Sequence, residues 1–98
     1  MTAPPLLLIE DTSSLQLVYR SVLENAGYKV VVTGDAATGL AAFQAQQPEV
    51  VLLDLMLPDR DGLSLMRDML EERPATRVVV ITSNGSIKKA VEAMRAGA

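Results

Sequence analysis

The sequence predicts an α/β domain in which helices cover both faces of a parallel sheet. Four short apolar runs alternate along the chain with four segments whose apolar residues recur at helical spacing, which gives strand and helix four times over. The apolar runs are continuous rather than alternating, which is typical of strands that are buried on both faces. Each connection between neighbouring parallel strands should be right-handed.

The expected strands are short and end in polar or turn-forming residues. They are residues 5–10 (PLLLIE), 28–32 (YKVVV), 49–54 (EVVLLD) and 77–82 (RVVVIT). Polar segments with helix-capping chemistry follow three of them, at 11–14 (DTSS), 34–35 (GD) and 84–86 (NGS).

The expected helices are marked by apolar stripes that end at helix breakers. The stripes lie within residues 15–26, 36–43, 63–70 and 87–94, and the breakers are Gly27, Pro48, Pro74 and Gly97. The second stripe is rich in alanine, which predicts a helix packed closely on the sheet.

Composition excludes several classes of function. The 98 residues are 49% hydrophobic but include only two Tyr and one Phe, so we expect one domain with an aliphatic core. The net charge of −3 without a basic cluster argues against nucleic acid contact by this segment. The absence of cysteine and histidine excludes disulfides, thiolate metal sites and histidine catalysis. Without a recognisable signal peptide or a run long enough to span a bilayer, we expect a cytoplasmic protein without membrane contact.

Acidic residues stand where two of the expected strands end. Glu10 and Asp11 close the first strand, Asp54 closes the third, and Thr82 closes the fourth. Ligands of open parallel sheets bind beyond these carboxyl ends. If the first and third strands are neighbours, three carboxylates converge there, and their repulsion favours a bound cation. Oxygen ligands select a hard ion, Mg²⁺ before Ca²⁺.

A carboxylate beside such an ion can attack phosphorus and form an acyl phosphate. The simpler interpretation is that an acid at a strand end caps the next helix, and a lone Asp11 would be read that way. Three acids at the ends of two strands, with the Thr82 hydroxyl at a third, favour a functional site.

The sequence resembles bacterial response-regulator receiver domains over essentially its whole length. The motifs that carry the resemblance are LLLIED (residues 6–11), VVLLDLMLPDRDG (50–62) and VVVITSNGS (78–86), in this order. The resemblance implies a flavodoxin-like doubly wound sheet, here with strand order 2-1-3-4. The segment NGSIKKAVEAMRAGA (84–98) also resembles the fourth helix of receivers attached to AAA+ regulators of the nitrogen-regulation and quorum-sensing type.

The resemblance implies a phosphoacceptor domain of a two-component system rather than an enzyme with a separate substrate. Asp54 would accept a phosphoryl group from a histidine kinase or phosphotransfer protein. Asp11, Asp54 and the backbone carbonyl of Met56 would hold Mg²⁺, and Glu10 would contribute through water. An output domain or partner, expected to control transcription, would respond.

The same resemblance assigns the residues around the phosphoryl group. The Thr82 hydroxyl and the backbone amides of Met56 and Ser83 would bind it, and Pro58 and Gly62 would shape the loop. Ser83 stands where the family usually has alanine, and this small residue should be tolerated. The remaining loop charges are expected to be solvated rather than ligands: Asp59, Arg60 and Asp61.

The chain stops at Ala98, before the fifth strand and helix of a receiver and before the lysine that the family pairs with the phosphoryl group. Neither Lys88 nor Lys89 matches that lysine. We therefore expect residues 1–98 to be a receiver that lacks its last strand and helix, with impaired phosphorylation. Strand 77–82 would then form an exposed edge, and the chain would form a homo-oligomer through this edge or by exchanging an element.

Three other classes of protein are alternatives. A haloacid-dehalogenase-type phosphatase needs a second aspartate two residues after Asp54, where Met56 stands. A dinucleotide-binding domain needs a glycine-rich turn after the first strand, where the sequence is EDTSS (residues 10–14). A non-signalling self-association module derived from a receiver remains open.

Overall fold

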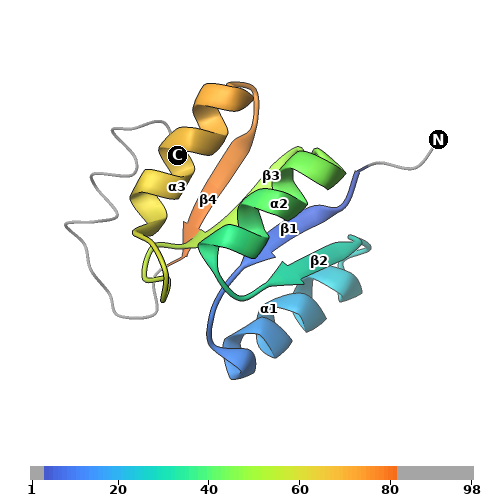
Figure 1. Cartoon of the computed structure of the whole chain (residues 1–98). Helices are drawn as coiled ribbons and strands as arrows, with labels where there is room; N and C mark the ends of the chain where they lie inside the picture. Colours follow the sequence, from blue (N-terminus) through green and yellow to red (C-terminus); the bar gives the residue numbers. More distant parts are fainter. Residues whose placement is uncertain (1–3, 82–98) are drawn as a thin grey trace.

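Four parallel strands form a single sheet in the order β2-β1-β3-β4 (Figure 1). The structure, a computed structural model, describes residues 4–81. The strands are β1 (Leu6–Ile9), β2 (Val30–Thr33), β3 (Val50–Asp54) and β4 (Arg77–Ile81). Both the parallel pairing and the predicted strand order are confirmed.

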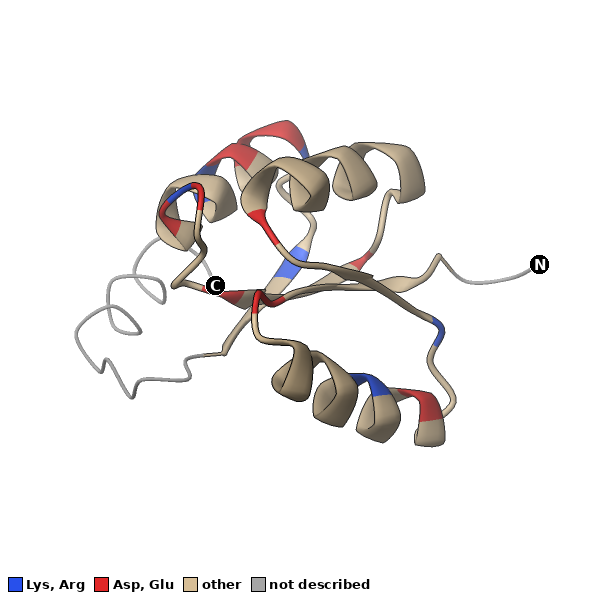
Figure 2. Ribbon diagram, turned by 60° about the horizontal axis from the view of Figure 1, so that its bottom comes forward, with Lys and Arg blue, Asp and Glu red and all other residues tan. Residues whose placement is uncertain are grey.

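Helices cover both faces of this sheet, as predicted. One face is covered by α1, and the other by α2 and α3 (Figure 2). Their bounds are α1 (Ser13–Asn25), α2 (Ala36–Gln46) and α3 (Gly62–Glu72). The predicted fourth helix lies outside the described residues. None of the helices within residues 4–81 is long and apolar enough to cross a bilayer.

The register of the central strands brings their carboxyl ends together. Ile9 on β1 pairs with Leu53 on β3 and with Thr33 on β2. Glu10 and Asp54 follow these paired residues directly, so both acids lie at the same edge of the sheet.

The core is formed mainly by β1, β3 and the inner sides of α2 and α3. All four residues of β1 are buried, whereas every residue of β2 is half-buried, and Val79 on β4 is 48% exposed. The prediction that all strands are buried on both faces is therefore right for β1 and wrong for the outer strands. An outer strand has one neighbour, so part of its surface remains open within the described residues.

The predicted close packing of α2 on the sheet is confirmed. Ala36, Gly39 and Phe43 are buried against it. A methyl group added at Gly39 would lie 2.8 Å from Ile9 Cδ1, which explains why a glycine faces the sheet at this position.

Helix α1 packs on the sheet far less completely than α2, and none of its residues is buried. Leu17, Val18 and Val22 are 70%, 56% and 62% exposed, so the side of the helix that carries them is largely open to solvent. Within residues 4–81, no element covers this side of the helix.

The helix ends follow the sequence signals with one exception. Gly27 has φ of 96°, the left-handed conformation expected of a glycine that ends a helix. The Asp35 carboxylate accepts the Thr38 amide at 2.7 Å and so caps α2. Thr12 occupies the N-cap of α1, but its side chain makes no capping hydrogen bond. The capping prediction for the 11–14 segment is therefore wrong in its side-chain detail.

Candidate functional site

Three carboxylates meet at the carboxyl ends of β1 and β3. Each of Glu10, Asp11 and Asp54 offers an oxygen, and these oxygens lie within 4.8 Å of one another. The structure thus brings together the three acids that the sequence placed at one edge. Thr82 and Ser83 lie outside the described residues.

Two members of this acidic cluster are almost inaccessible to solvent. Glu10 is 1% exposed and Asp54 0%, while Asp11 is exposed. Burial, together with the neighbouring Asp54 and Asp11 charges, raises the pKa of Glu10 to about 7. Burial also raises the pKa of Asp54, and the Asp11 charge adds to this rise. Without a bound cation, ionisation of all three carboxylates in this cluster is therefore unfavourable.

The two oxygens of Asp54 have different surroundings. The Met56 backbone N–H donates to Oδ1 at 3.0 Å, which fixes the orientation of the carboxylate. Oδ2 is buried and has no hydrogen-bond partner among the described residues. A buried oxygen of this kind costs free energy unless a cation or donor reaches it. It therefore fits the Mg²⁺ site that the sequence predicted.

Glu10 accepts two hydrogen bonds from the segment that follows it. Its Oε1 accepts the Thr12 backbone N–H at 3.1 Å, and its backbone carbonyl accepts the Gln16 side-chain amide. These bonds hold the start of α1 against the acidic cluster. They explain why α1 begins at this point although Thr12 supplies no side-chain cap.

A closed loop connects Asp54 to α3. We call residues 55–61 the β3–α3 loop. Its base is closed by an antiparallel bridge between Met56 and Asp61, and by a hydrogen bond from Gly62 N to Leu55 O at 3.0 Å. Gly62 lies so close to the strand end that an added methyl group would be 2.5 Å from Leu55 Cα. The predicted importance of Gly62 for the loop thus has a steric basis.

The charged residues of this loop are attached to helices. The Asp59 carboxylate accepts the backbone amides of Ala36 and Ala37, at 2.8 and 3.0 Å. Arg60 donates to Ser64 and forms an ion pair with Asp68. The Asp61 carboxylate accepts the Leu63 amide at 3.2 Å and caps α3.

These three charges are therefore not only solvated, because each also bonds to a helix. Asp59 and Asp61 are exposed, and none of the three belongs to the acidic cluster. An aspartate directly before the helical stripe could have indicated the Asp61 cap. No sequence signal links Asp59 to α2, because the partners are more than 20 residues apart.

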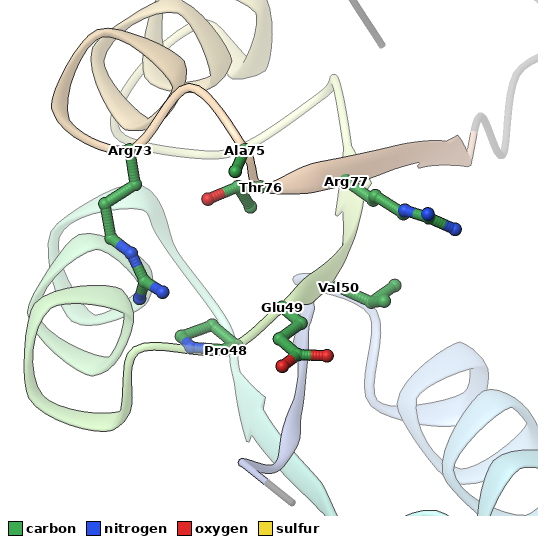
Figure 3. A pocket seen from close by; sticks show the side chains of 7 residues that line it. All are labelled: Pro48, Glu49, Val50, Arg73, Ala75, Thr76 and Arg77. Atoms are coloured by element: carbon green, nitrogen blue, oxygen red, sulfur yellow. The ribbon is translucent and has the colours of Figure 1, made fainter.

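One cavity of the described residues lies away from the acidic cluster. It has a volume of about 490 Å³ and is formed around the amino-terminal ends of β3 and β4, lined by Pro48, Glu49, Val50, Arg73, Ala75, Thr76 and Arg77 (Figure 3). The two arginine side chains point away from each other, and Arg73 lies over the Phe43 ring at 5.7 Å from its centre. The C-caps of α2 and α3, Gln47 and Arg73, lie at or beside this cavity.

A family model for the response regulator receiver domain matches residues 6–98. The chain belongs to this family. The match includes the acidic cluster and the β3–α3 loop, and the receiver has the sheet order that the resemblance implied.

Curated relatives of this receiver include regulators from several bacteria. LuxO, a regulatory protein of Vibrio cholerae, is 36% identical over 91 residues, which is 93% of this chain and 20% of LuxO. AlgB, an alginate biosynthesis transcriptional regulatory protein of Pseudomonas aeruginosa, is 36% identical over 93 residues, 95% of this chain and 21% of AlgB. The chain thus spans about a fifth of these relatives.

Solved structures agree with the fold. NtrX from Brucella abortus superposes with a TM-score of 0.91 at 31% identity, covering 99% of this chain and 22% of NtrX. A CheY-like receiver domain protein from Methanospirillum hungatei gives a TM-score of 0.89 at 27% identity, covering 99% of this chain and 78% of that protein. The predicted similarity to receivers of the quorum-sensing and nitrogen-regulation type agrees with the LuxO and NtrX matches.

Proposed function

We propose that this receiver accepts a phosphoryl group on Asp54 from a histidine kinase or phosphotransfer protein. The observation that carries the proposal is the buried Asp54 carboxylate, which has one oxygen fixed by the Met56 amide and the other without a partner in the described part of the chain. Asp11, Asp54 and the Met56 carbonyl would hold Mg²⁺, with Glu10 contributing through water. The exposed side of the cluster, at Asp11, gives a donor access.

In this reaction an oxygen of the ionised Asp54 carboxylate attacks phosphorus, and the bond from phosphorus to the donor breaks. The products are an acyl phosphate on Asp54 and the donor without its phosphoryl group. When bound by Asp11, Asp54 and the Met56 carbonyl, Mg²⁺ would neutralise the charge of the carboxylates and of the phosphoryl oxygens. The Met56 N–H orients the carboxylate, and the Thr82 hydroxyl and Ser83 amide are proposed to bind the transferred group.

The proposed consequence is control of an output domain or partner, in keeping with the names of relatives that are transcriptional regulators. The receiver would be cytoplasmic and would catalyse only its own phosphorylation and dephosphorylation. Self-association without signalling is a less supported role, because it gives no reason for burying two acids beside a third.

Phosphoryl uptake from acetyl phosphate tests the proposed function. The intact mass should gain one phosphoryl group in the presence of Mg²⁺ and none after chelation. Asp54→Asn should abolish uptake, because its amide is neither anionic nor nucleophilic. Glu71→Gln, which changes an exposed acid on α3, should take up the group as the parent does. Equal uptake by Asp54→Asn and the parent would exclude Asp54 as the acceptor.

A second proposal concerns assembly of the 98-residue chain. In the described sheet β4 pairs only with β3, and Val79 on β4 is half exposed. An open strand edge is a template for pairing with another chain. We expect a closed two-fold dimer or higher oligomer formed by pairing of these edges or by element exchange, and light scattering after size-exclusion chromatography measures it. A well-folded monomer at micromolar concentration would contradict this proposal.

A further inference from the structure

We propose that Asp59 is a positioning residue that fastens the β3–α3 loop to the first turn of α2 and thereby fixes the backbone of Met56. This inference rests on the proposed function for its consequence, since Met56 is expected to serve both Asp54 and Mg²⁺. The attachment itself rests only on the geometry of the described residues.

The attachment joins two distant parts of the chain. The two oxygens of Asp59 accept from two successive amides, Oδ1 from Ala36 at 2.8 Å and Oδ2 from Ala37 at 3.0 Å. The next amide of the same helix turn, that of Thr38, is taken by Asp35 at 2.7 Å. The first amides of α2 are thus shared between its own N-cap and a residue of the loop that follows β3.

The loop is therefore fixed at both its base and its tip. The base is closed by the bridge from Met56 to Asp61 and by the hydrogen bond from Gly62 to Leu55. The tip is held by Asp59. The side chain of Met56 is 44% exposed, so packing does little to place its backbone. The position of the Met56 amide, which binds Asp54 Oδ1, depends on these attachments.

The charge of Asp59 suits this role. Its hydrogen bond from Ala36, followed by that from Ala37, holds the pKa of this carboxyl below its usual value. The residue thus remains ionised at neutral pH, and an anion at a helix N-terminus interacts favourably with the helix dipole. Asp59 is not among the acids whose oxygens lie close enough together to hold a metal ion. It therefore acts through the loop rather than as a ligand.

Asp35 provides a matched control, because its side chain caps the same helix and, within residues 4–81, hydrogen-bonds to Thr38 and not to the loop. Asp35→Ala and Asp59→Ala each remove a carboxylate from the start of α2. If Asp59 were only a helix cap, the two variants would behave alike. If it positions the loop, only Asp59→Ala should disturb Met56.

The test is amide hydrogen exchange on the metal-free 98-residue chain, followed by Mg²⁺ titration. In Asp59→Ala, exchange at Met56 and Gly62 should become about five- to tenfold faster, roughly the effect of one lost hydrogen bond to a charged group in an exposed position. Mg²⁺ affinity should fall by a similar factor. Asp59→Asn keeps one acceptor oxygen and should give an intermediate result, while Asp35→Ala should leave exchange at Met56 and Gly62 unchanged.

Two results would overturn the inference: unchanged exchange at Met56 and Gly62 in Asp59→Ala, or equal acceleration in Asp35→Ala. The exchange measurement needs neither metal nor phosphate. If the parent protein neither binds Mg²⁺ nor takes up phosphate, the proposed function fails, while the exchange data still decide whether Asp59 holds the loop.

Discussion

Gly62→Ala should lower the free energy of unfolding by about 3 kcal/mol, at the upper end of the usual cost of overpacking. The added Cβ would lie 2.5 Å from Leu55 Cα, 2.7 Å from Asp54 O and 2.9 Å from Leu55 O. All three are backbone atoms, so no side chain can rotate to relieve the contact. Either the end of β3 or the start of α3 must move. Because Asp54 lies at this strand end, the variant should also weaken Mg²⁺ binding.

Substitution of two other glycines by alanine serves as a control that separates this steric clash from the other effects of a Gly→Ala change. Gly27 has a positive φ but no atom within 4 Å of an added Cβ, so Gly27→Ala should cost only about 1–2 kcal/mol of backbone strain. Gly39→Ala would meet the Ile9 side chain, which can shift. Chemical denaturation measures all three, and Mg²⁺ titration measures the site. A Gly62→Ala variant as stable as Gly27→Ala, with normal Mg²⁺ affinity, would contradict the account.

Without metal, the protein should lose stability as the pH rises from about 4.5 to 7. The pKa of Glu10 is about 7 in the folded state against an ordinary value of 4.5. In this window the folded state binds more protons than the unfolded state, so the free energy of unfolding falls with increasing pH. The fall from Glu10 is at most about 3 kcal/mol, since each pKa unit corresponds to about 1.4 kcal/mol. The raised pKa of Asp54 acts in the same direction.

Variants and metal should alter this pH dependence predictably. Glu10→Gln should flatten it, because the group no longer titrates. Asp11→Asn should reduce it slightly by removing a neighbouring negative charge, and should also weaken Mg²⁺ binding. Saturating Mg²⁺ should abolish the fall, because the ion favours the ionised carboxylates. Denaturation curves at several pH values, with and without Mg²⁺, provide the measurement; a metal-free protein whose stability rises between pH 4.5 and 7 would refute this electrostatic description.

The parallel sheet and the acidic cluster could be predicted from the sequence for a simple reason, whereas the strand order was implied by the resemblance to receiver domains. Continuous apolar runs indicate buried parallel strands, and parallel strands that are neighbours bring their carboxyl ends to one edge of the sheet. Glu10, Asp11 and Asp54 follow from that rule once β1 and β3 are neighbours. The prediction needed no knowledge of side-chain contacts.

What the sequence did not predict depends on contacts between distant residues. The bonds from Asp59 to α2 require the loop after β3 to meet a helix that begins more than 20 residues earlier. The greater exposure of β2 and β4 depends on each having one neighbouring strand in the described sheet, while their composition resembles that of β1. Thr12 has good capping chemistry, yet it is the side chain of Glu10 that accepts the Thr12 amide.

The location of the phosphoryl group tests the central claim most directly. After reaction with acetyl phosphate and Mg²⁺, the protein is cleaved into peptides and the modified residue is identified by tandem mass spectrometry. The account predicts a single modified residue, Asp54, and no modification when Mg²⁺ is chelated. Modification at Glu10, Asp11 or Asp59 instead of Asp54, or modification of Asp54 that is equally fast without Mg²⁺, would contradict it.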